Sequence, residues 1–492
     1  MLSNNTDTQP WRWAHNYTQL PEPLYSLLPP EPVPSPMLLL FNGVLAQQLG
    51  LGALLNDSDT TAQWLGGKQV PPGANPLAQA YAGHQFGHFT MLGDGRAILL
   101  GEHISPSGQM LDIQLKGSGR TPYSRQGDGR ATLSAMLREY LISEAMYGLG
   151  IPTSRSLAVV LTGDGVRRER IQHGAVLTRV AASHLRVGTF EYARRFTPIT
   201  VLEKLLQYAI ERHYPSMATH ENPALGFLEA VMERQLALIT DWMRVGFIHG
   251  VMNTDNMTIS GETIDYGPCA FMNTYHPGTV FSSIDTQGRY AFGNQPPIAQ
   301  WNIARLAEAL LPLIHPNAEE AIKLAQTLIE RFPSRYDQQW LAMMGKKLGF
   351  AAPTPEDRTL MVDLLALMQT QQMDYTNTFL YLQTGQSPDK QTEEACQTPD
   401  FQAWQTRWVQ QIGGEEQKKT AQNLMQAYNP AYIPRNHLVE QALLSATEEQ
   451  DLKPFQTLVQ LVSKPYEEQK GMEIYQTPPP QGDQDYRTFC GT

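Results

Sequence analysis

The stretch from His249 to Asn256 reads HGVMNTDN, and the triplet Asp265-Tyr266-Gly267 begins nine residues after Asn256. An amide oxygen and a carboxylate are the kinds of ligand that hold Mg²⁺ against phosphates. Residues 257–264, MTISGETI, predict two short strands around a Ser-Gly turn. Such a hairpin would bring Asn256 and Asp265 to the same end, so the stretch predicts a site for a metal ion and phosphates.

The spacing matches two motifs of protein kinases, the catalytic loop H-R-D-x-x-x-x-N and the metal-binding D-F-G. Asn256 falls where the first motif has its metal ligand, and Asp265 opens the second. The kinase base, two residues after the histidine, is replaced by Val251, while another carboxylate, Asp255, lies directly beside Asn256. An ordinary polar turn with an Asx hydrogen bond explains any one of these residues alone. The combination favours a functional site that lacks the usual kinase base.

A strand lysine and a helix glutamate form a second candidate pair. Lys116 ends an alternating run over 111–116 that predicts a strand, and Glu139 follows 23 residues later within a predicted helix over about 130–150. Glu139 shares its helical stripe with apolar residues, so a cation should meet it. Kinases hold nucleotide phosphates with such a Lys–Glu pair. Two alternatives stay open: Glu139 is partly exposed and pairs with a neighbouring arginine, or Glu144 is the acidic partner.

The pattern G-x-G-R occurs three times, at Gly93–Arg96, Gly117–Arg120 and Gly127–Arg130. Glycine lets successive backbone N–H groups point at an anion, and the arginine adds a permanent charge. The first copy has Ile98 where a kinase G-x-G-x-x-G loop has its third glycine. Tight hairpin turns are the alternative role for at least one copy.

The charge distribution points to phosphate rather than nucleic acid. The 492 residues carry a net charge of −11, which argues against a nucleic-acid partner. The segment from Lys116 to Arg195, however, contains thirteen basic and six acidic residues. Nearly all of the basic residues are arginine, whose guanidinium group matches phosphate oxygens best. Arg179 and Arg186 lie seven residues apart and would share one face if their segment is helical.

His84 and His88 are predicted to have packing or turn roles, because glycines interrupt the helix that a metal-binding pair of histidines would need.

Hydropathy and proline punctuation divide the chain into four predicted parts. Residues 1–80 form a proline-rich wrapping segment of irregular chain with short helices. Residues 81–197 form a β-rich lobe that binds nucleotide phosphates, and residues 198–345 form a helical lobe with the catalytic and metal loops. Residues 346–492 form a helical extension and a loosely held tail. The predicted fold is therefore α+β, a protein-kinase-like two-lobed fold with an N-terminal wrapping segment and a C-terminal helical extension.

Cysteine content and the N-terminus indicate the compartment. The three cysteines cannot form a disulfide framework, and the first residues lack the features of a secretory signal. The sequence has no apolar stretch of the ~20 residues that a spanning helix requires. We expect a cytoplasmic monomer without a membrane partner.

Taken together, the motifs of the chain resemble those of the selenoprotein O family, whose bacterial members are the YdiU proteins. The resemblance runs from about residue 75 to at least 310, and less specifically over the whole chain. It is carried by Gly83–Gly87, Leu92–Arg96, Leu115–Gly117, Pro122–Arg125, Gly127–Arg130, Ser183–Arg186, His249–Met257 and Asp265–Pro268.

The resemblance implies a protein adenylyltransferase. In that family ATP binds in a flipped orientation, so AMP rather than the γ-phosphoryl group passes to Ser, Thr or Tyr hydroxyls of proteins. By motif match, Asp255 is the general base, and Asn256 and Asp265 hold Mg²⁺ or Mn²⁺. A reversed nucleotide also explains why Val251 replaces the kinase base.

The resemblance also assigns the nucleotide ligands and a regulatory pair. Lys116, positioned by Glu139, joins Arg179 and Arg186 around the far phosphates, while the nucleotide pocket is lined by Gly93, Gly95, Arg96, Asp128 and Gly129. Relatives use a disulfide between a C-terminal cysteine and the activation-loop region, here Cys490 and Cys269. A buried inert thiol is the alternative for Cys269. Alternative functions are UMP transfer with Mn²⁺, a conventional kinase that uses Asp255, and a nucleotide-binding pseudokinase scaffold.

Overall fold

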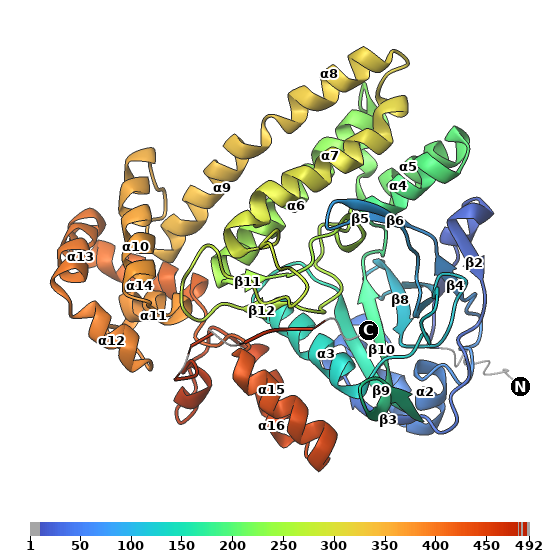
Figure 1. Cartoon of the computed structure of the whole chain (residues 1–492), viewed down its shortest axis with the longest axis horizontal. Coiled ribbons are helices and arrows are strands. Elements are labelled where there is room, and N and C mark those ends of the chain that lie inside the picture. The colour runs from blue at the N-terminus through green and yellow to red at the C-terminus, as the bar shows by residue number, and fades with distance from the viewer. Residues whose placement is uncertain (1–9, 481, 484–485, 490–492) are drawn as a thin grey trace, which may run out of the picture.

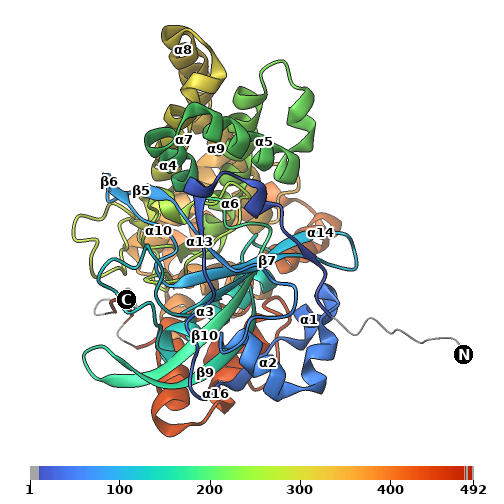
Figure 2. The same cartoon turned by 90° about the vertical axis from the view of Figure 1, so that its right-hand side faces the viewer.

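A computed structural model describes residues 10–480, 482–483 and 486–489. It has two lobes (Figure 1, Figure 2), and residues of both line a cleft. The first lobe is built on an antiparallel sheet, and the second is helical and continues into a helical C-terminal region. This confirms the predicted α+β, two-lobed architecture. No helix within the described ranges is both long and apolar enough to cross a membrane.

The sheet has the strand order β2-β4-β7-β8-β10-β9-β3, and β1 pairs with β7. Its strands are β1 Trp13–Ala14, β2 Tyr25–Leu27, β3 Met37–Phe41, β4 Leu77–Gln79, β7 Ala97–Ile104, β8 Met110–Lys116, β9 Arg155–Arg167 and β10 Ile171–Ala181. Separate two-stranded sheets pair β5 Ala82–Gln85 with β6 His88–Met91, and β11 Phe247–Ile248 with β12 Ala270–Phe271.

Strand β8 directs polar side chains toward the second lobe. Successive side chains of a strand point to opposite faces. Ile113 and Leu115 join the apolar core of the first lobe. Asp112 and Lys116 point the other way, where Asp112 Oδ1 lies 2.5 Å from Arg212 of α5 Ile199–His213. The predicted alternation therefore places Lys116 at the boundary between the lobes.

The first 80 residues differ from their prediction. The segment contributes strands β1 to β4 to the sheet, together with helices α1 Gly43–Leu49 and α2 Ser58–Leu65. The prediction of irregular wrapping chain was wrong in this respect, because each strand is only two to five residues long and shows no clear period in the sequence. The division of the chain into four parts remains a prediction.

Helix α3 Leu133–Gly148 packs against β9 and β10 and carries Glu139 inward. The Thr132 side chain caps it by accepting a hydrogen bond from the Ala135 N–H at 3.4 Å. Gly150, with φ of 74°, follows its C-terminus. Leu137 and Leu141 contribute to a core that α15 Asn436–Leu444 and α16 Lys453–Val462 cover from the other side.

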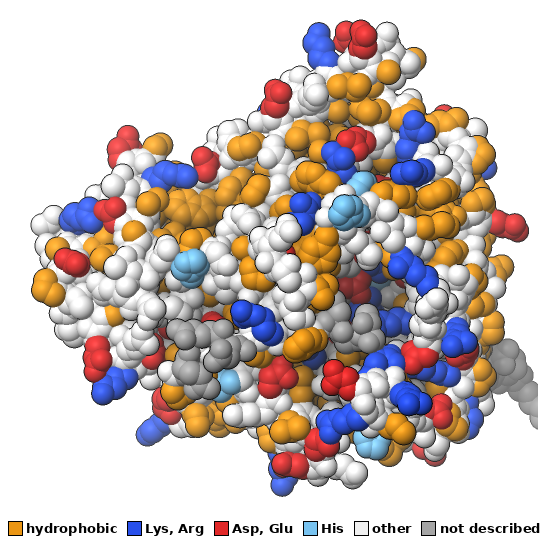
Figure 3. Space-filling view, viewed as in Figure 1, with side chains coloured by type: hydrophobic (Ala, Val, Ile, Leu, Met, Phe, Trp, Pro, Cys, Tyr) orange, Lys and Arg blue, Asp and Glu red, His pale blue; other side chains and the backbone are white. Residues whose placement is uncertain are grey.

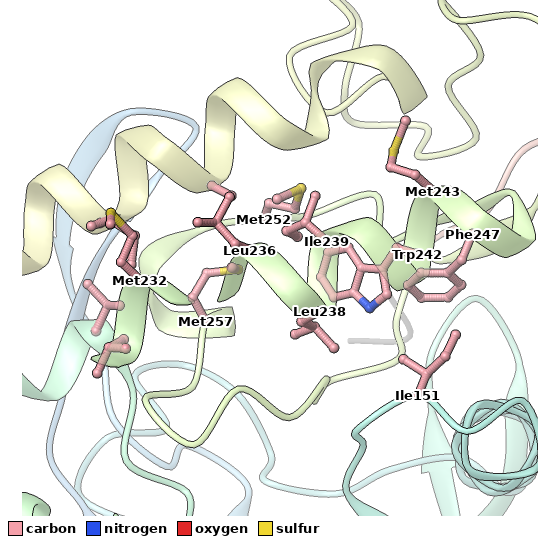
Figure 4. Packing of buried hydrophobic residues seen from close by; sticks show 14 of the residues in the cluster. Ile151, Met232, Leu236, Leu238, Ile239, Trp242, Met243, Phe247, Met252 and Met257 are labelled. Atoms are coloured by element: carbon pink, nitrogen blue, oxygen red, sulfur yellow. The ribbon is translucent and has the colours of Figure 1, made fainter. Parts of the chain in front are cut away.

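Helix α6 Pro223–Val245 is the central element of the second lobe. Its N-terminus is capped by Asn222, and Gly246 ends it in the left-handed conformation. Figure 4 shows Trp242 packed near Phe247 and Ile151 in the apolar core. Trp242 Nε1 also donates to Thr263 Oγ1 at 2.9 Å, which connects this core to the loop that leads to Asp265.

The remaining helices complete the second lobe and the C-terminal region. They are α4 Val187–Phe196, α7 Gln295–Ile314, α8 Ala318–Ile329, α9 Phe332–Lys347, α10 Arg358–Thr370, α11 Tyr375–Thr384, α12 Lys390–Cys396, α13 Pro399–Ile412 and α14 Glu415–Tyr428.

The tail is attached more firmly than the sequence predicts. Thr488 Oγ1 donates to the Pro268 carbonyl at 2.7 Å, and Asn273 Nδ2 donates to Asp483 at 2.6 Å. The described tail residues therefore pack against the segment that follows Asp265, and the prediction of a loosely held tail was wrong for them. Their contacts are made with residues more than 200 positions away, so the local sequence carries no sign of them.

Two glycines with similar backbone angles give a test of the packing. Gly129 has φ of 68° and Gly150 has φ of 74°. A Cβ at Gly129 would lie 2.1 Å from the Gly119 carbonyl, whereas a Cβ at Gly150 would have no other atom within 4 Å. Gly150→Ala should cost only the left-handed strain of about 1–2 kcal/mol. Gly129→Ala should lower the midpoint of urea-induced unfolding clearly further, and equal losses would contradict this packing.

Candidate active site

The cleft between the lobes has a volume of about 390 Å³ and contains nearly all of the predicted site residues. Lys and Arg side chains border the hollow in the space-filling view (Figure 3). Glu139 lies behind Lys116 and lines a neighbouring cavity. The predicted residues that line the cleft itself are Gly93, Gly95, Arg96, Lys116, Asp128, Gly129, Arg179, Arg186, Asp255, Asn256 and Asp265.

Lys116 and Glu139 form a buried ion pair. The Lys116 Nζ lies 2.6 Å from Glu139 Oε2 and 3.0 Å from Asp265 Oδ1. Glu144, the alternative partner, instead accepts from Arg155 at 2.7 Å. Glu139 also bonds to an arginine, Arg179, as the first alternative has it, but it is buried rather than partly exposed.

Arg179 and Arg186 converge on Asp265, although not from a helix. Arg179 lies on strand β10, and Arg186 is the N-terminal flanking residue of α4, so the condition for a shared helical face is not met. Arg186 Nη1 lies 2.6 Å from Asp265 Oδ2, and Arg179 Nη2 donates to Asp265 Oδ1. Asp265 itself has φ of 60°, a conformation that costs energy for a residue with a Cβ. Its three cationic partners, Lys116 included, stabilise that conformation.

The charges of this cluster control its protonation. Burial alone would raise the pKa of Asp265. The positive charges of Arg179, Lys116 and Arg186 outweigh burial and hold this pKa well below its usual range. Burial and the neighbouring Arg179 lower the pKa of Lys116, while Glu139 opposes them. Glu139 also has a lowered pKa, because Arg179 and Lys116 outweigh the effect of its burial. Both carboxylates are therefore ionised at neutral pH.

Asp255 lies in the short 3₁₀ turn Thr254–Asn256, with only 8% of its surface exposed. Its backbone carbonyl accepts a hydrogen bond from Arg186 Nη1 at 2.7 Å. A Cβ at Gly83 of β5 would lie 2.5 Å from Asp255 Oδ1, so only glycine fits there. Burial raises the pKa of Asp255 to about 7, and Arg186 opposes this rise. This carboxylate is thus closely enclosed at the edge of the cleft.

Asn256 and Asp265 supply oxygen ligands that suit a hard divalent cation. Asn256 Nδ2 donates to the Val251 carbonyl at 2.9 Å, which leaves the amide oxygen free of that bond. The predicted hairpin between them is reduced to a single antiparallel bridge between Met257 and Thr263. Among the described residues, no three His, Cys, Asp or Glu side chains are grouped as a metal site. Phosphate oxygens would have to complete the coordination of a cation here.

The three G-x-G-R segments have different roles in the cleft wall. Gly93 packs against Tyr123, and a Cβ there would lie 2.3 Å from its ring. The second and third copies pair with each other through the Gly119 N–H and the Gly129 carbonyl at 3.0 Å. Asp128 of the third copy accepts from Arg168 at 2.7 Å. These turns expose backbone to the cleft beside arginine side chains.

A family model for protein adenylyltransferase SelO matches residues 10–463. The chain belongs to the SelO family. It is a protein nucleotidyltransferase of that family. Similar SelO-family proteins, each called protein nucleotidyltransferase YdiU, come from Bacillus cytotoxicus (55% identity over 485 residues, 98% of both chains), Anoxybacillus flavithermus (55% over 483 residues, 98% of this chain and 99% of the relative) and Nitrosococcus oceani (52% over 485 residues, 98% and 97%).

Among solved structures, ROP2 from Toxoplasma gondii, described as a virulence factor with a protein-kinase fold and no enzymatic activity, aligns with a TM-score of 0.24 and 13% identity. The alignment covers 59% of the SelO-family chain and 87% of ROP2. A TM-score this low carries no argument about fold or activity.

Some residues of the SelO-family cleft were missed by the sequence analysis. The Tyr81 ring lies under the Arg186 guanidinium at 4.5 Å, and Asp94 accepts from the Gln79 N–H at 3.1 Å while lying 3.9 Å from Arg186. Asp94 stands inside the first G-x-G-R copy, where it could have been noticed. Tyr81 had no comparable signal, because only the fold brings it to Arg186.

The predicted cysteine and histidine roles have different outcomes. Cys269 is fully buried and burial raises its pKa to about 12, which is the inert state given above as the alternative. Cys490 lies outside the described residues, so the disulfide remains a prediction. His84 Nδ1 lies 2.5 Å from Glu191 Oε1, so this histidine contacts another side chain of the protein, in line with the predicted packing role.

Removing one charge from the buried cluster of this SelO-family chain should be costly. Glu139→Gln leaves Lys116 and Arg179 without their carboxylate, and such changes destabilise proteins by about 3–5 kcal/mol. The control is Glu448→Gln, which breaks the more exposed pair with Arg170 and should cost less than about 1 kcal/mol. Denaturant titration of both variants measures this, and similar losses would contradict the assigned role of the buried pair.

Proposed function

We propose that the chain transfers AMP from ATP to Ser, Thr or Tyr hydroxyls of other proteins and releases pyrophosphate. The observation that carries this proposal is the place of Asp255. Its carboxylate lines the cleft beside Asn256, whereas Val251 stands where a kinase has its base. Membership of the SelO family supports a nucleotidyl rather than a phosphoryl transfer.

We assign the far phosphates of ATP to Lys116, Arg179 and Arg186. These three cations meet at Asp265, and guanidinium groups match phosphate oxygens well. Glu139 is assigned the role of positioning Lys116 and Arg179, since it contacts both. The remaining part of the nucleotide pocket is assigned to Gly93, Gly95, Arg96, Asp128 and Gly129, which line the same cleft.

Asn256 and Asp265 would hold Mg²⁺ or Mn²⁺, since amide and carboxylate oxygens suit these ions. Such a cation supplies neutralisation of the charge on the phosphate oxygens. The chain contributes positioning and fixed positive charge, which account for most of the catalysis in phosphate-transfer sites.

In the proposed reaction, Asp255 accepts the proton of the acceptor hydroxyl. The hydroxyl oxygen forms a bond to the α-phosphorus, and the bond between that phosphorus and the oxygen that bridges to the β-phosphate breaks. Pyrophosphate leaves with the electron pair of that bond. The product protein carries AMP in a phosphodiester linkage, and Arg186, which bonds to the Asp255 carbonyl, keeps the base near the phosphates.

Labelled nucleotides test the proposal. With ATP labelled at the α-phosphate, we expect the label to appear on protein bands, and with ATP labelled at the γ-phosphate we expect none. Label that arrives only from the γ-position would identify a kinase instead. Competition between unlabelled ATP and UTP in the presence of Mn²⁺ distinguishes AMP from UMP transfer.

Asp255→Asn should reduce the transfer of the α-label by at least about 100-fold, because a positioned base contributes roughly 10² to 10⁴ in rate. The control is Asp164→Asn, an exposed acid on β9 that does not line the cleft. Binding of a non-hydrolysable ATP analogue should persist in both variants. Full transfer activity in Asp255→Asn would contradict the assignment of the base.

A further inference from the structure

A groove of about 560 Å³ lies beside the cleft, between the β5–β6 hairpin and the segment 284–298. Apolar and basic side chains share its lining. The Ile284 side chain is half exposed there, at 51%. The apolar lining residues include Phe86, Ile284 and Ile298, and the basic side of the lining includes His88 and Arg289.

Both walls of the groove are attached to the loop that carries Asp255. The Phe86 N–H donates to Asn253 Oδ1 at 3.0 Å, and the Tyr290 hydroxyl donates to the same oxygen at 2.6 Å. Asn253 precedes Asp255 by two residues. Gln85 lines the nucleotide cleft and its neighbour Phe86 lines the groove. The groove and the nucleotide cleft therefore lie on either side of the hairpin tip, and Asn253, two residues before the proposed base, bonds to Phe86 of the groove and lines the cleft.

Phe86 is held in a strained conformation at this boundary. Phe86 has φ of 50°, so this non-glycine residue occupies the left-handed region at the hairpin tip. The next residue, Gly87, has φ of 84°. The Phe86 ring packs against Tyr290 with the centroids 5.1 Å apart. Such strain persists only where surrounding contacts fix it, and it is concentrated at functional sites. The bond to Asn253 is one of the fixing contacts.

Arg289 presents a fixed positive charge in the groove. Its guanidinium lies over the Trp301 ring at 4.8 Å and also beside Gly87. It forms no ion pair with a carboxylate of the described residues, its Nε is buried without a hydrogen-bond partner, and its guanidinium also lies 5.6 Å from the Tyr290 ring. The acidic residue of the groove, Asp285, accepts from the backbone N–H groups of Arg289 and Tyr290 at 2.9 and 2.8 Å. The guanidinium thus lies beside two aromatic rings, and no carboxylate of the described residues neutralises its charge in the groove.

We propose that this groove binds the segment of the protein substrate that carries the acceptor hydroxyl, and that Arg289 binds an acidic side chain near that hydroxyl. The inference rests on the proposed transfer to protein hydroxyls. An acceptor must reach Asp255 while the nucleotide occupies the cleft, and both walls of the groove are bonded to Asn253 in the loop that carries Asp255. Phe86, Ile284 and Ile298 provide apolar contacts for a neighbouring side chain of the segment.

A charge reversal tests the inference. The probe is a pair of degenerate peptide libraries centred on Ser, Thr or Tyr, one with Asp and Glu around the hydroxyl and one with Lys and Arg. With α-labelled ATP, the unaltered protein should label the acidic library about tenfold faster at low salt, an effect of the size expected for one fixed charge. Arg289→Glu should reverse the preference, and Arg289→Gln should abolish it. High salt should weaken the preference.

The control variant is Arg358→Glu, which alters another arginine stacked on a tryptophan, Trp340, at 4.9 Å. It should keep the acidic preference. Equal labelling of both libraries by the unaltered protein, or an unchanged preference in Arg289→Glu, would overturn the inference. So would labelling of intact proteins without labelling of either library, because the groove is assigned to a short segment. Binding of a non-hydrolysable ATP analogue should be the same in all variants. The proposed function itself fails only if no α-label reaches any hydroxyl.

Discussion

The meeting of Lys116, Arg179 and Arg186 on the single carboxylate of Asp265 is the interaction on which the rest of the site depends. Buried charges are stable only when they are paired, and Glu139 balances Lys116 and Arg179 from the other side. The cluster joins strands β8 and β10, helix α3, the N-terminus of α4 and the loop that follows the catalytic segment. It fixes the position of the two lobes at the cleft and provides positive charge where phosphates are proposed to bind.

Ordinary local rules place each member of this cluster. The alternation of β8 turns Lys116 away from the apolar core, and α3 carries Glu139 on the side that faces the sheet. Trp242 of α6 connects the core of the second lobe to Thr263, two residues before Asp265. The same catalytic segment also supports the adjacent groove through Asn253. The same catalytic segment therefore lines the nucleotide cleft and, through Asn253, supports the proposed acceptor groove.

The sequence predicts the parts of this site that have a local signature. Asn256, Asp265, Lys116 and Glu139 were predicted because motif spacing, strand alternation and the cost of an unpaired carboxylate can be read along the chain. For Arg179 and Arg186 a shared face was predicted only for a helical segment, and they instead reach Asp265 from a strand and a helix N-terminus. Short edge strands such as β2 have no readable period. The sequence has no signal for the groove, because only tertiary packing brings Phe86 and Arg289 to line the same cavity.

The central claim is that a reversed triphosphate binds where the three cations now contact Asp265. A crystal structure with a non-hydrolysable ATP analogue and Mn²⁺ tests it most directly. We expect the α-phosphorus beside Asp255, the metal on Asn256 and Asp265, and Lys116, Arg179 and Arg186 on the outer phosphates. A γ-phosphate beside Asp255, with Asn256 and Asp265 turned away from the metal, would contradict it.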